Sequence, residues 1–345
     1  PPLGGSGFAY DNHIGYAVLF GGLGTGAVYS ASTYEYRSGV WTIGPTTGPS
    51  ARAYAGMAFD RVTDQLVLFG GNRGSTYLSD TWTLAGQTWS MVASGSPSAR
   101  TGDAVAFDGL PSDSYIIVWG GVNGATFYGE TWQFSGTGWN RLSLGTSPPA
   151  LTGAVLVNIP SAGYVVLFGG MGGGGRITNA TWIFRGGSWT ELSLTHAPSA
   201  RYDEAATFDP DLGGAVLFGG YNGGTYLNDT WEFVNGAWTN VTPGPAPPAR
   251  DLAGIAFAEN PVNAVVLFGG YNGTAYLQDT WEFNGIAWLQ NHSLAAPPAR
   301  ADPAMTYDGP DSYIVMFGGY NGTAPEVYND TWVFRGITPT GWSKV

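Results

Sequence analysis

Acidic residues recur within three positions after an arginine that itself returns about every 50 residues. The acids concerned are Asp103, Asp203, Glu204, Asp251 and Asp302, with Tyr54 and Tyr202 at neighbouring positions. Carboxylates that converge could bind a cation or a basic group of a ligand. A pair such as Asp203 and Asp251 could also serve a glycosidase or lyase, although no spacing in the sequence distinguishes that use. A solvated acidic rim is the alternative.

The composition excludes several kinds of catalytic and metal site. The 345 residues include no cysteine, which excludes disulfides, thiolate nucleophiles and zinc–thiolate sites. The three histidines, His13, His196 and His292, are far apart in the sequence. Further acids occur in pairs at predicted turns, where capping of the turn explains them and calcium is the alternative. These pairs are Asp60 with Asp64, Asp108 with Asp113, Asp209 with Asp211, and Asp308 with Asp311. We therefore expect no metal or other cofactor.

Charge and composition also limit the partners. The net charge of −12 disfavours binding to nucleic acid or to an anionic membrane surface. No apolar run approaches the roughly 18 residues of a membrane helix, so we expect no direct membrane insertion. Lys344 is the single lysine, and seven Asn-x-Ser/Thr sequons occur, which together favour an extracellular or cell-surface location. The candidate glycosylation sites are Asn240, Asn272, Asn291 and Asn321, because Asn179, Asn228 and Asn329 arise from a recurring x-Thr-Trp phrase.

The elements that would position these residues repeat along the chain. "VLFGGYNGGTYLNDTW" at 216–231 returns as "VLFGGYNGTAYLQDTW", and the glycine pairs are spaced by 49 or 50 residues. Each repeat contains four apolar or aromatic segments separated by turn formers, without helical periodicity. This pattern predicts an all-β fold, a seven-bladed β-propeller of four-stranded antiparallel blades. The whole chain, 1–345, is then one domain, with blades at approximately 1–48, 49–97, 98–147, 148–197, 198–246, 247–296 and 297–345.

An apolar strand, a Gly-Gly pair, an aromatic third-strand residue and a spaced fourth-strand tryptophan resemble the kelch repeat. The resemblance covers the full length and points to blades like those of the central domain of galactose oxidase, of the secreted microbial type. It implies ligand uptake by the loops after the glycines and by the linkers between blades. The copper site of galactose oxidase uses a cysteine-linked tyrosine, which this chain lacks. The third-strand tyrosine usual in kelch repeats is present only as Tyr36.

The glycine pair lies between the predicted starts of two strands. Five repeats carry an arginine at the start of the first strand: Arg52, Arg100, Arg201, Arg250 and Arg300. Five carry an acid at the start of the third strand: Asp80, Glu130, Asp229, Asp279 and Asp330. Repeat one has Leu3 and Ser32 instead, and repeat four has Leu151 and Ala180.

Because the same two repeats lose both partners, we predict an ion pair within each of the other blades. We expect the guanidinium to cross the glycines, which leave room for it and also adopt positive φ cheaply. The two partners are expected to be lost together. Removing one partner of a buried ion pair lowers stability by about 3 to 5 kcal/mol, whereas replacing both by apolar residues is nearly neutral. The alternative is that both residues face solvent or a ligand independently.

The loops after the glycines carry tyrosines beside Asn-Gly turns, including Tyr221, Tyr271 and Tyr320. Such tyrosines suit sugar stacking or protein contact, or they pack only against their own loops. We therefore expect a non-catalytic, extracellular or cell-surface binding propeller that recognises a glycan or a protein. One alternative is a structural component that assembles with other domains or with copies of itself. Another is a carbohydrate-active enzyme that uses the acids after the arginines, which we expect at the mouth of the central channel of the propeller.

Overall fold

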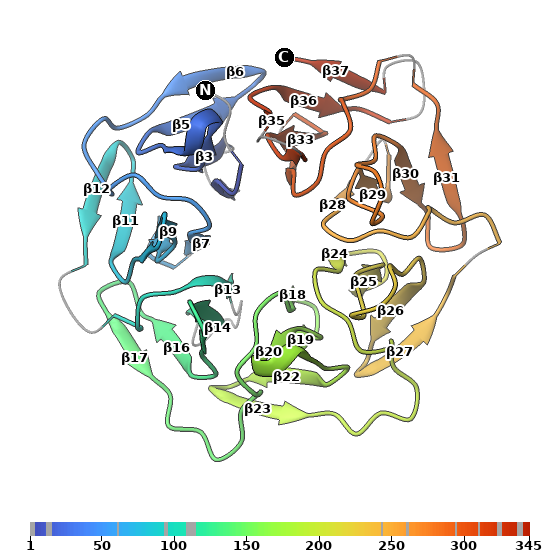
Figure 1. Cartoon of the computed structure of the whole chain (residues 1–345), viewed down its shortest axis with the longest axis horizontal. Helices are drawn as coiled ribbons and strands as arrows, with labels where there is room; N and C mark the ends of the chain where they lie inside the picture. The colour runs from blue at the N-terminus through green and yellow to red at the C-terminus, as the bar shows by residue number, and fades with distance from the viewer. Residues whose placement is uncertain are drawn as a thin grey trace.

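The computed structural model describes residues 4–11, 16–60, 62–92, 96–107, 115–242, 244–259, 262–293, 295–309, 311–322, 326–336 and 341–345. Within these residues, the repeats form seven antiparallel sheets with a path of four strands each. The sheets stand around a central axis in chain order and are called sheet one to sheet seven here (Figure 1). The prediction of an all-β fold built of four-stranded antiparallel sheets is confirmed.

The four strands of each sheet follow one another outward from the axis (Figure 1). The first strands are β1 (Gly7–Asp11), β7 (Gly56–Asp60), β13 (Thr101–Phe107), β18 (Val155–Ile159), β24 (Ala205–Asp209), β28 (Gly254–Ala258) and β32 (Ala304–Asp308). The second strands are β2 (Tyr16–Phe20), β8 (Gln65–Phe69), β14 (Ile116–Asn123), β19 (Tyr164–Phe168), β25 (Gly214–Phe218), β29 (Ala264–Phe268) and β33 (Tyr313–Phe317).

The two outer strands of each sheet complete the path. The third strands are β5 (Thr33–Arg37), β11 (Thr81–Ala85), β16 (Thr131–Phe134), β22 (Thr181–Arg185), β26 (Thr230–Val234), β30 (Thr280–Phe283) and β36 (Thr331–Phe334). The fourth strands are β6 (Val40–Ile43), β12 (Thr88–Met91), β17 (Trp139–Arg141), β23 (Ser188–Glu191), β27 (Ala237–Asn240), β31 (Trp288–Asn291) and β37 (Trp342–Lys344). All seven third strands begin on a threonine.

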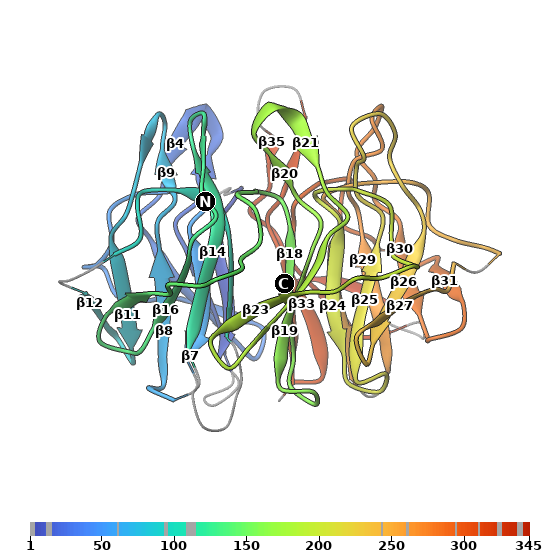
Figure 2. The same cartoon turned by 90° about the horizontal axis from the view of Figure 1, so that it is seen from below.

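Short two-stranded ribbons and two 3₁₀ turns lie in the loops after the glycine pairs. These elements are β3 (Leu23–Gly24), η1 (Thr25–Ala27), β4 (Val28–Tyr29), β9 (Asn72–Arg73), β10 (Thr76–Tyr77), β15 (Thr126–Phe127), β20 (Met171–Gly172), η2 (Gly173–Gly175), β21 (Arg176–Ile177), β34 (Tyr320–Asn321) and β35 (Glu326–Val327). Figure 2 shows them projecting from one face, called the loop face here. The opposite face, where first strands turn into second strands, is called the turn face. No helix among the described residues is long and apolar enough to cross a membrane.

The second strands form the core of the molecule because each is enclosed by the neighbouring sheets on both sides. All five residues of β19, "YVVLF", and of β29, "AVVLF", are buried. Continuous apolar runs of β-branched and aromatic residues are typical of strands covered on both faces. The core is therefore divided into clusters between consecutive sheets, such as the one that joins Val165 and Leu167 of sheet four to Ile117 of sheet three.

The fourth-strand tryptophans join each sheet to the one before it. In every repeat the indole Nε1 donates to the first threonine of the preceding third strand, as Trp189 does to Thr131 at 2.7 Å. The remaining pairs are Trp89 with Thr33, Trp139 with Thr81, Trp238 with Thr181, Trp288 with Thr230, Trp342 with Thr280, and Trp41 with Thr331. The same indoles pack edge-on against the aromatic residue before the preceding glycine pair, as Trp238 does on Phe168.

The ring closes without an exchanged strand. Sheet one takes all its strands from the beginning of the chain and sheet seven takes all of its strands from the end. The bond from Trp41 Nε1 to Thr331 Oγ1, 2.6 Å long, continues the tryptophan–threonine series across this junction. Tyr10 adds a hydrogen bond to Asp308 at 3.0 Å. The last sheet therefore closes directly on the first.

The first strands begin later than the sequence pattern suggested. Arg201 precedes β24 by four residues, and Arg250 precedes β28 by the same distance. Two positions after the arginine, or after the leucine that replaces it in repeats one and four, one residue of each repeat adopts positive φ, which turns the backbone away from an extended path. These residues are Gly5, Tyr54, Gly102, Gly153, Asp203, Leu252 and Asp302, with φ between 50° and 65°. Together they form the mouth of the central channel on the loop face.

Candidate functional site

Each of the five expected arginine–acid pairs is formed within its own sheet, with a shortest nitrogen–oxygen distance of 2.6 Å. The arginine side chains are fully buried. Arg250 shows the arrangement: Nε donates to the Pro248 carbonyl at 2.8 Å, Nη1 to the Gly269 carbonyl at 2.8 Å, and both Nη atoms to Asp279. The guanidinium thus lies beside the first glycine, as predicted, and it makes four hydrogen bonds.

A tryptophan two residues after the acid completes this clamp. Trp281 Nε1 donates to Asp279 Oδ2 at 2.6 Å, and Trp82, Trp231 and Trp332 do the same for their own acids. Burial alone would raise the pKa of the clamp acids. The arginine hydrogen bonds and charge, with the tryptophan bond at the four aspartates, outweigh burial and lower the pKa of Asp80, Glu130, Asp229, Asp279 and Asp330. The clamp acids are consequently ionised at neutral pH.

The glycine pair serves another purpose than the one expected. At Gly70, Gly219 and Gly269 an added Cβ would first meet the backbone carbonyl of the next repeat's arginine, at 2.5 to 2.8 Å, rather than a guanidinium. Among the described residues, the second glycine of six pairs donates its N–H to the carbonyl at this position of the next repeat, as Gly270 does to Arg300 at 2.8 Å. Room for the arginine side chain is therefore the wrong explanation: the pair allows two backbones of neighbouring sheets to touch. The expected positive φ is confirmed, with values between 65° and 104° in all seven pairs.

Sheet four shows why the glycines persist where the clamp is lost. Gly170 still donates to the carbonyl of Arg201 at 2.8 Å. Leu151 is buried and packs in an apolar cluster with Ala180, so this repeat replaces both clamp partners by apolar groups. The indole Nε1 of Trp182, which has no acid two residues before it, is buried without a partner among the described residues. In repeat one, Leu3 lies outside the described residues.

Six tyrosines form a continuous series of ring contacts across sheets five to seven of the loop face. The series runs Tyr202, Tyr221, Tyr226, Tyr271, Tyr276 and Tyr320, with consecutive ring centroids 4.8 to 5.8 Å apart. We call it the tyrosine arc. The sequence predicted Tyr202, Tyr221, Tyr271 and Tyr320 as separate ligand contacts. The structure joins them, and because contacts such as Tyr226 with Tyr271 bridge two sheets, the tyrosines do not pack only within their own loops.

The Asn-Gly turns set the geometry of the arc. Asn222 Oδ1 accepts hydrogen bonds from the backbone N–H groups of Gly224 and Thr225, and Asn272 does the same for Thr274 and Ala275. These Asx turns fold each loop back on itself. They place Tyr221 beside Tyr226, and Tyr271 beside Tyr276, with the rings half-buried.

Three acids converge beneath the arc at the channel mouth. Burial raises the pKa of Asp251 to about 7, and the charge of Asp203 adds to this effect. Burial likewise raises the pKa of Asp203 to about 6. The side chain of Asp302 is exposed. Desolvation by the surrounding protein and the charge of Asp203 nevertheless raise the pKa of Asp302 to about 6. Asp251 is 9% exposed, and its Oδ1 has no partner among the described residues. A solvated acidic rim is therefore wrong for Asp251.

Tyr54 completes the mouth from sheet two, while two predicted acids lie elsewhere. Desolvation and the charge of Asp302 raise the pKa of Tyr54, so its ring lies near that carboxylate. Asp103 is buried beside Gly56 and shows no coupling to the other mouth acids; desolvation raises its pKa to about 7. Glu204 is buried between Gly169 and Gly220, where desolvation raises its pKa strongly. The mouth therefore unites Tyr54, Asp203, Asp251 and Asp302.

The mouth also stores backbone strain. Four of its seven positive-φ positions carry side chains other than glycine: Tyr54, Asp203, Leu252 and Asp302. A non-glycine residue in this region costs on the order of 1 kcal/mol. The backbone is held there by hydrogen bonds between neighbouring sheets, such as Leu252 N–H to Asp203 O at 3.0 Å and Asp302 N–H to Leu252 O at 2.8 Å. Glycine would be cheaper at each position, so these side chains point to a function at the mouth.

Other candidate positions have structural roles or are accessible for modification. Asp60 and Asp209 accept backbone N–H groups two and three residues later, which confirms turn capping. Asp108 and Asp113 lie outside the described residues, as does His13.

Within the described part of the chain, no group of three or more His, Cys, Asp or Glu side chains could hold a metal ion. Among the four sequons singled out, Asn240 is exposed, whereas the amide of Asn291 donates to Glu282 at 2.9 Å.

Sequence reasoning missed two features. The threonine that receives the tryptophan bond was not singled out, although it recurs at the same place in all seven repeats. The cavity at the turn-face end of the channel, described below, was also missed. Its signal was the aromatic residue near the end of most first strands, as in "GFAYD", "GMAFD" and "AMTYD".

Comparison with known proteins agrees with this architecture. The family model described as the KLHDC2/KLHL20/DRC7 Kelch-repeats domain matches residues 163–345, which is more than half of the chain. No curated protein matches the sequence.

Proposed function

The chain belongs to the kelch-repeat family, and from this premise we propose that it is a non-catalytic, seven-bladed binding propeller. Its partner is a protein, which contributes an exposed segment to the tyrosine arc and the channel mouth. Kelch repeats generally mediate protein binding, which supports a protein partner. The observation that carries the proposal is the unbroken contact of six tyrosine rings beside Asp251, whose Oδ1 has no hydrogen-bond partner among the described residues.

The arc is well suited to contact a polypeptide. Tyrosine rings offer a large contact area and lose little conformational entropy on binding, and each ring has a polar tip that gives direction. Here the contact between rings already restrains them, which reduces the ordering cost further. The three acids below the arc supply negative charge that a partner's basic side chain would neutralise. A segment that combines basic and aromatic or apolar residues therefore fits best.

The proposal places the propeller outside the cell or at its surface, and includes a glycan as an alternative ligand. The single lysine and the exposed sequon at Asn240 support this location. Half-buried tyrosine rings are also able to stack on sugars. A structural role by self-assembly and a carbohydrate-active enzyme remain alternatives. The enzyme alternative rests on the coupling of Asp203 with Asp251 and predicts turnover that Asp203→Asn abolishes.

A peptide-display experiment tests the proposal. A library of random peptides is selected on the intact chain, and the enriched peptides are measured against Tyr226→Ala and Tyr271→Ala variants. We expect basic and aromatic residues to be enriched, and each variant to weaken binding at least tenfold, as is usual for central aromatic contacts. Tyr77→Ala is the matched control, because Tyr77 lies in the loop of sheet two, away from the arc.

Two results would contradict the proposal. Selection without any enrichment would argue against a peptide ligand, and binding that survives both arc variants but not the control would place the interface elsewhere. The same variants on a glycan array decide between the two ligand classes. Binding to defined glycans that depends on Tyr226 and Tyr271 would replace the protein partner by a carbohydrate.

A further inference from the structure

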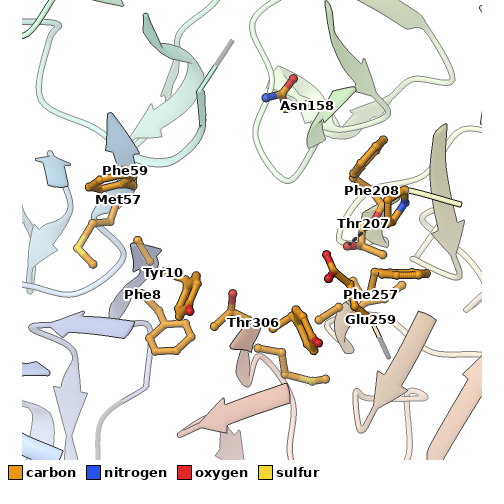
Figure 3. A pocket seen from close by; sticks show the side chains of 16 residues that line it. Phe8, Tyr10, Met57, Phe59, Asn158, Thr207, Phe208, Phe257, Glu259 and Thr306 are labelled. Atoms are coloured by element: carbon orange, nitrogen blue, oxygen red, sulfur yellow. Dashed lines mark hydrogen bonds between the residues drawn. The ribbon is translucent and has the colours of Figure 1, made fainter. Parts of the chain in front are cut away.

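A second cavity lies on the axis at the turn-face end of the channel, opposite the mouth. Its volume is about 510 Å³, within the range of small-molecule sites. Side chains from six of the seven first strands surround it, and Figure 3 shows them arranged around a shared central space. We call it the axial cavity. It is separate from the tyrosine arc, which lies on the loop face.

Aromatic rings and thioethers dominate the wall of the axial cavity. The rings are those of Phe8, Tyr10, Phe59, Phe208, Phe257 and Tyr307. Met57 and Met305 add polarisable sulfur atoms. These side chains recur because alternate residues of each first strand point to the same side. A ligand here would meet apolar surface from most directions.

The polar groups of the wall include one full negative charge. Among the described residues that line the cavity, Glu259 is the single charged one, and none is lysine or arginine. Figure 3 shows the Glu259 carboxylate directed into the central space. Asn158 Oδ1 is buried without a hydrogen-bond partner in the described part of the chain. Tyr10 uses its hydroxyl hydrogen on Asp308 at 3.0 Å, so it offers a ligand only lone pairs and the ring face.

We propose that the axial cavity binds an organic ammonium ion, that is, an amine with an apolar body. The faces of aromatic rings attract cations, by about 0.5 to 2 kcal/mol per favourable contact. The ammonium N–H groups would donate to the Glu259 carboxylate, while the apolar body would pack against phenylalanine and methionine. The net charge of −12 also favours the approach of a cation. An anion would face Glu259 without a positive side chain among the described residues of the wall, and a hydrocarbon would leave the Glu259 carboxylate without a partner.

Isothermal titration with three probes of similar shape tests this proposal: benzylamine as cation, benzyl alcohol as neutral compound and benzoate as anion. We expect affinity to fall in that order, with benzylamine at least tenfold tighter than benzoate. Glu259→Gln should weaken benzylamine binding about threefold, the effect of one partly exposed charge. Glu259 is exposed, so this variant should fold normally. Glu191→Gln removes the same charge on the outer strand of sheet four and should leave the affinity unchanged.

The methionine methyl groups give a second, site-specific readout. The chain has five methionines, of which Met57 and Met305 line the axial cavity. With ¹³C-methyl labelling, benzylamine should shift these two resonances and leave Met91, Met171 and Met316 in place. The proposal is overturned if benzoate binds as tightly as benzylamine, if Glu259→Gln has no more effect than Glu191→Gln, or if neither methyl resonance moves. A Tyr226→Ala variant should bind benzylamine normally, which separates this result from the peptide experiment.

Discussion

Two sets of five carboxylates lie toward the loop face and behave in opposite ways. The clamp set is Asp80, Glu130, Asp229, Asp279 and Asp330, each paired with a buried guanidinium, and its pKa values are lowered. The second set is Asp103, Asp203, Glu204, Asp251 and Asp302. None of these acids forms an ion pair among the described residues, and their pKa values are raised.

The difference separates structure from function. A buried carboxylate with a partner on every lone pair stabilises one conformation, whereas a buried carboxylate without a partner reduces stability. A buried carboxylate without a partner is typical of a functional site, where a ligand supplies the missing partner and the cost in stability is tolerated. Three acids of the second set lie under the tyrosine arc, where four strained side chains also gather. Substitutions in the two sets should therefore change stability in opposite directions.

The largest expected effect is at the clamp. Arg250→Ala leaves Asp279 buried without its guanidinium and should lower the free energy of unfolding by about 3 to 5 kcal/mol. Urea denaturation followed by tryptophan fluorescence measures it. The matched control is the double variant Arg250→Leu with Asp279→Leu, which reproduces the apolar arrangement of sheet four. It should lose far less than the single variant, and equal losses would show that the pair does not act as a unit.

The pH dependence of stability comes second and separates the two sets directly. Acids with a raised folded-state pKa bind protons more tightly when folded, so their contribution to stability is present at low pH and is lost as the pH rises through about 6 to 7. Clamp acids have lowered values, so their contribution is present at neutral pH and is lost as the pH falls below about 4.

We therefore expect the free energy of unfolding to rise as the pH falls from 8 to 5, by an amount on the order of 2 kcal/mol. Below about pH 4 it should drop. The contribution of Asp302 to the rise is reduced because solvent screens it. Thermal unfolding at fixed ionic strength over this range measures the curve. A monotonic loss of stability from pH 8 downward would mean that the second set is solvated and unperturbed.

Asp251→Asn is the third test and connects stability to binding. The amide removes a buried charge without changing size, so stability at pH 8 should increase by about 1 kcal/mol. Peptide binding at the arc should weaken. Asp279→Asn is the matched substitution in the clamp set and should destabilise. If Asp251→Asn also destabilises, Asp251 belongs with the clamp acids and the functional interpretation of the mouth fails.

The sequence predicted the pairs well because two repeats lose both partners together, and such a joint loss reports a contact. It predicted the tyrosines one by one, since each stands beside an Asn-Gly turn, but not that Tyr226 of sheet five would touch Tyr271 of sheet six. Contacts between sheets depend on how the sheets are arranged around the axis, which no single repeat encodes. The glycine pair was misinterpreted for the same reason: its close neighbour is the backbone of the following repeat.

The smallest expected effect comes from installing a clamp in sheet four. The double variant Leu151→Arg with Ala180→Asp should change the free energy of unfolding by less than about 1 kcal/mol, since a buried ion pair and an apolar pair of similar volume are nearly equivalent. The introduced carboxylate would also accept from Trp182 Nε1, which has no partner among the described residues. Leu151→Arg alone should destabilise strongly, because it buries an unpaired charge.

Rescue of that variant by Ala180→Asp, measured by urea denaturation, would show that the clamp can be transferred between repeats. Failure of the rescue would mean that sheet four differs from its neighbours in backbone geometry as well as in these two side chains.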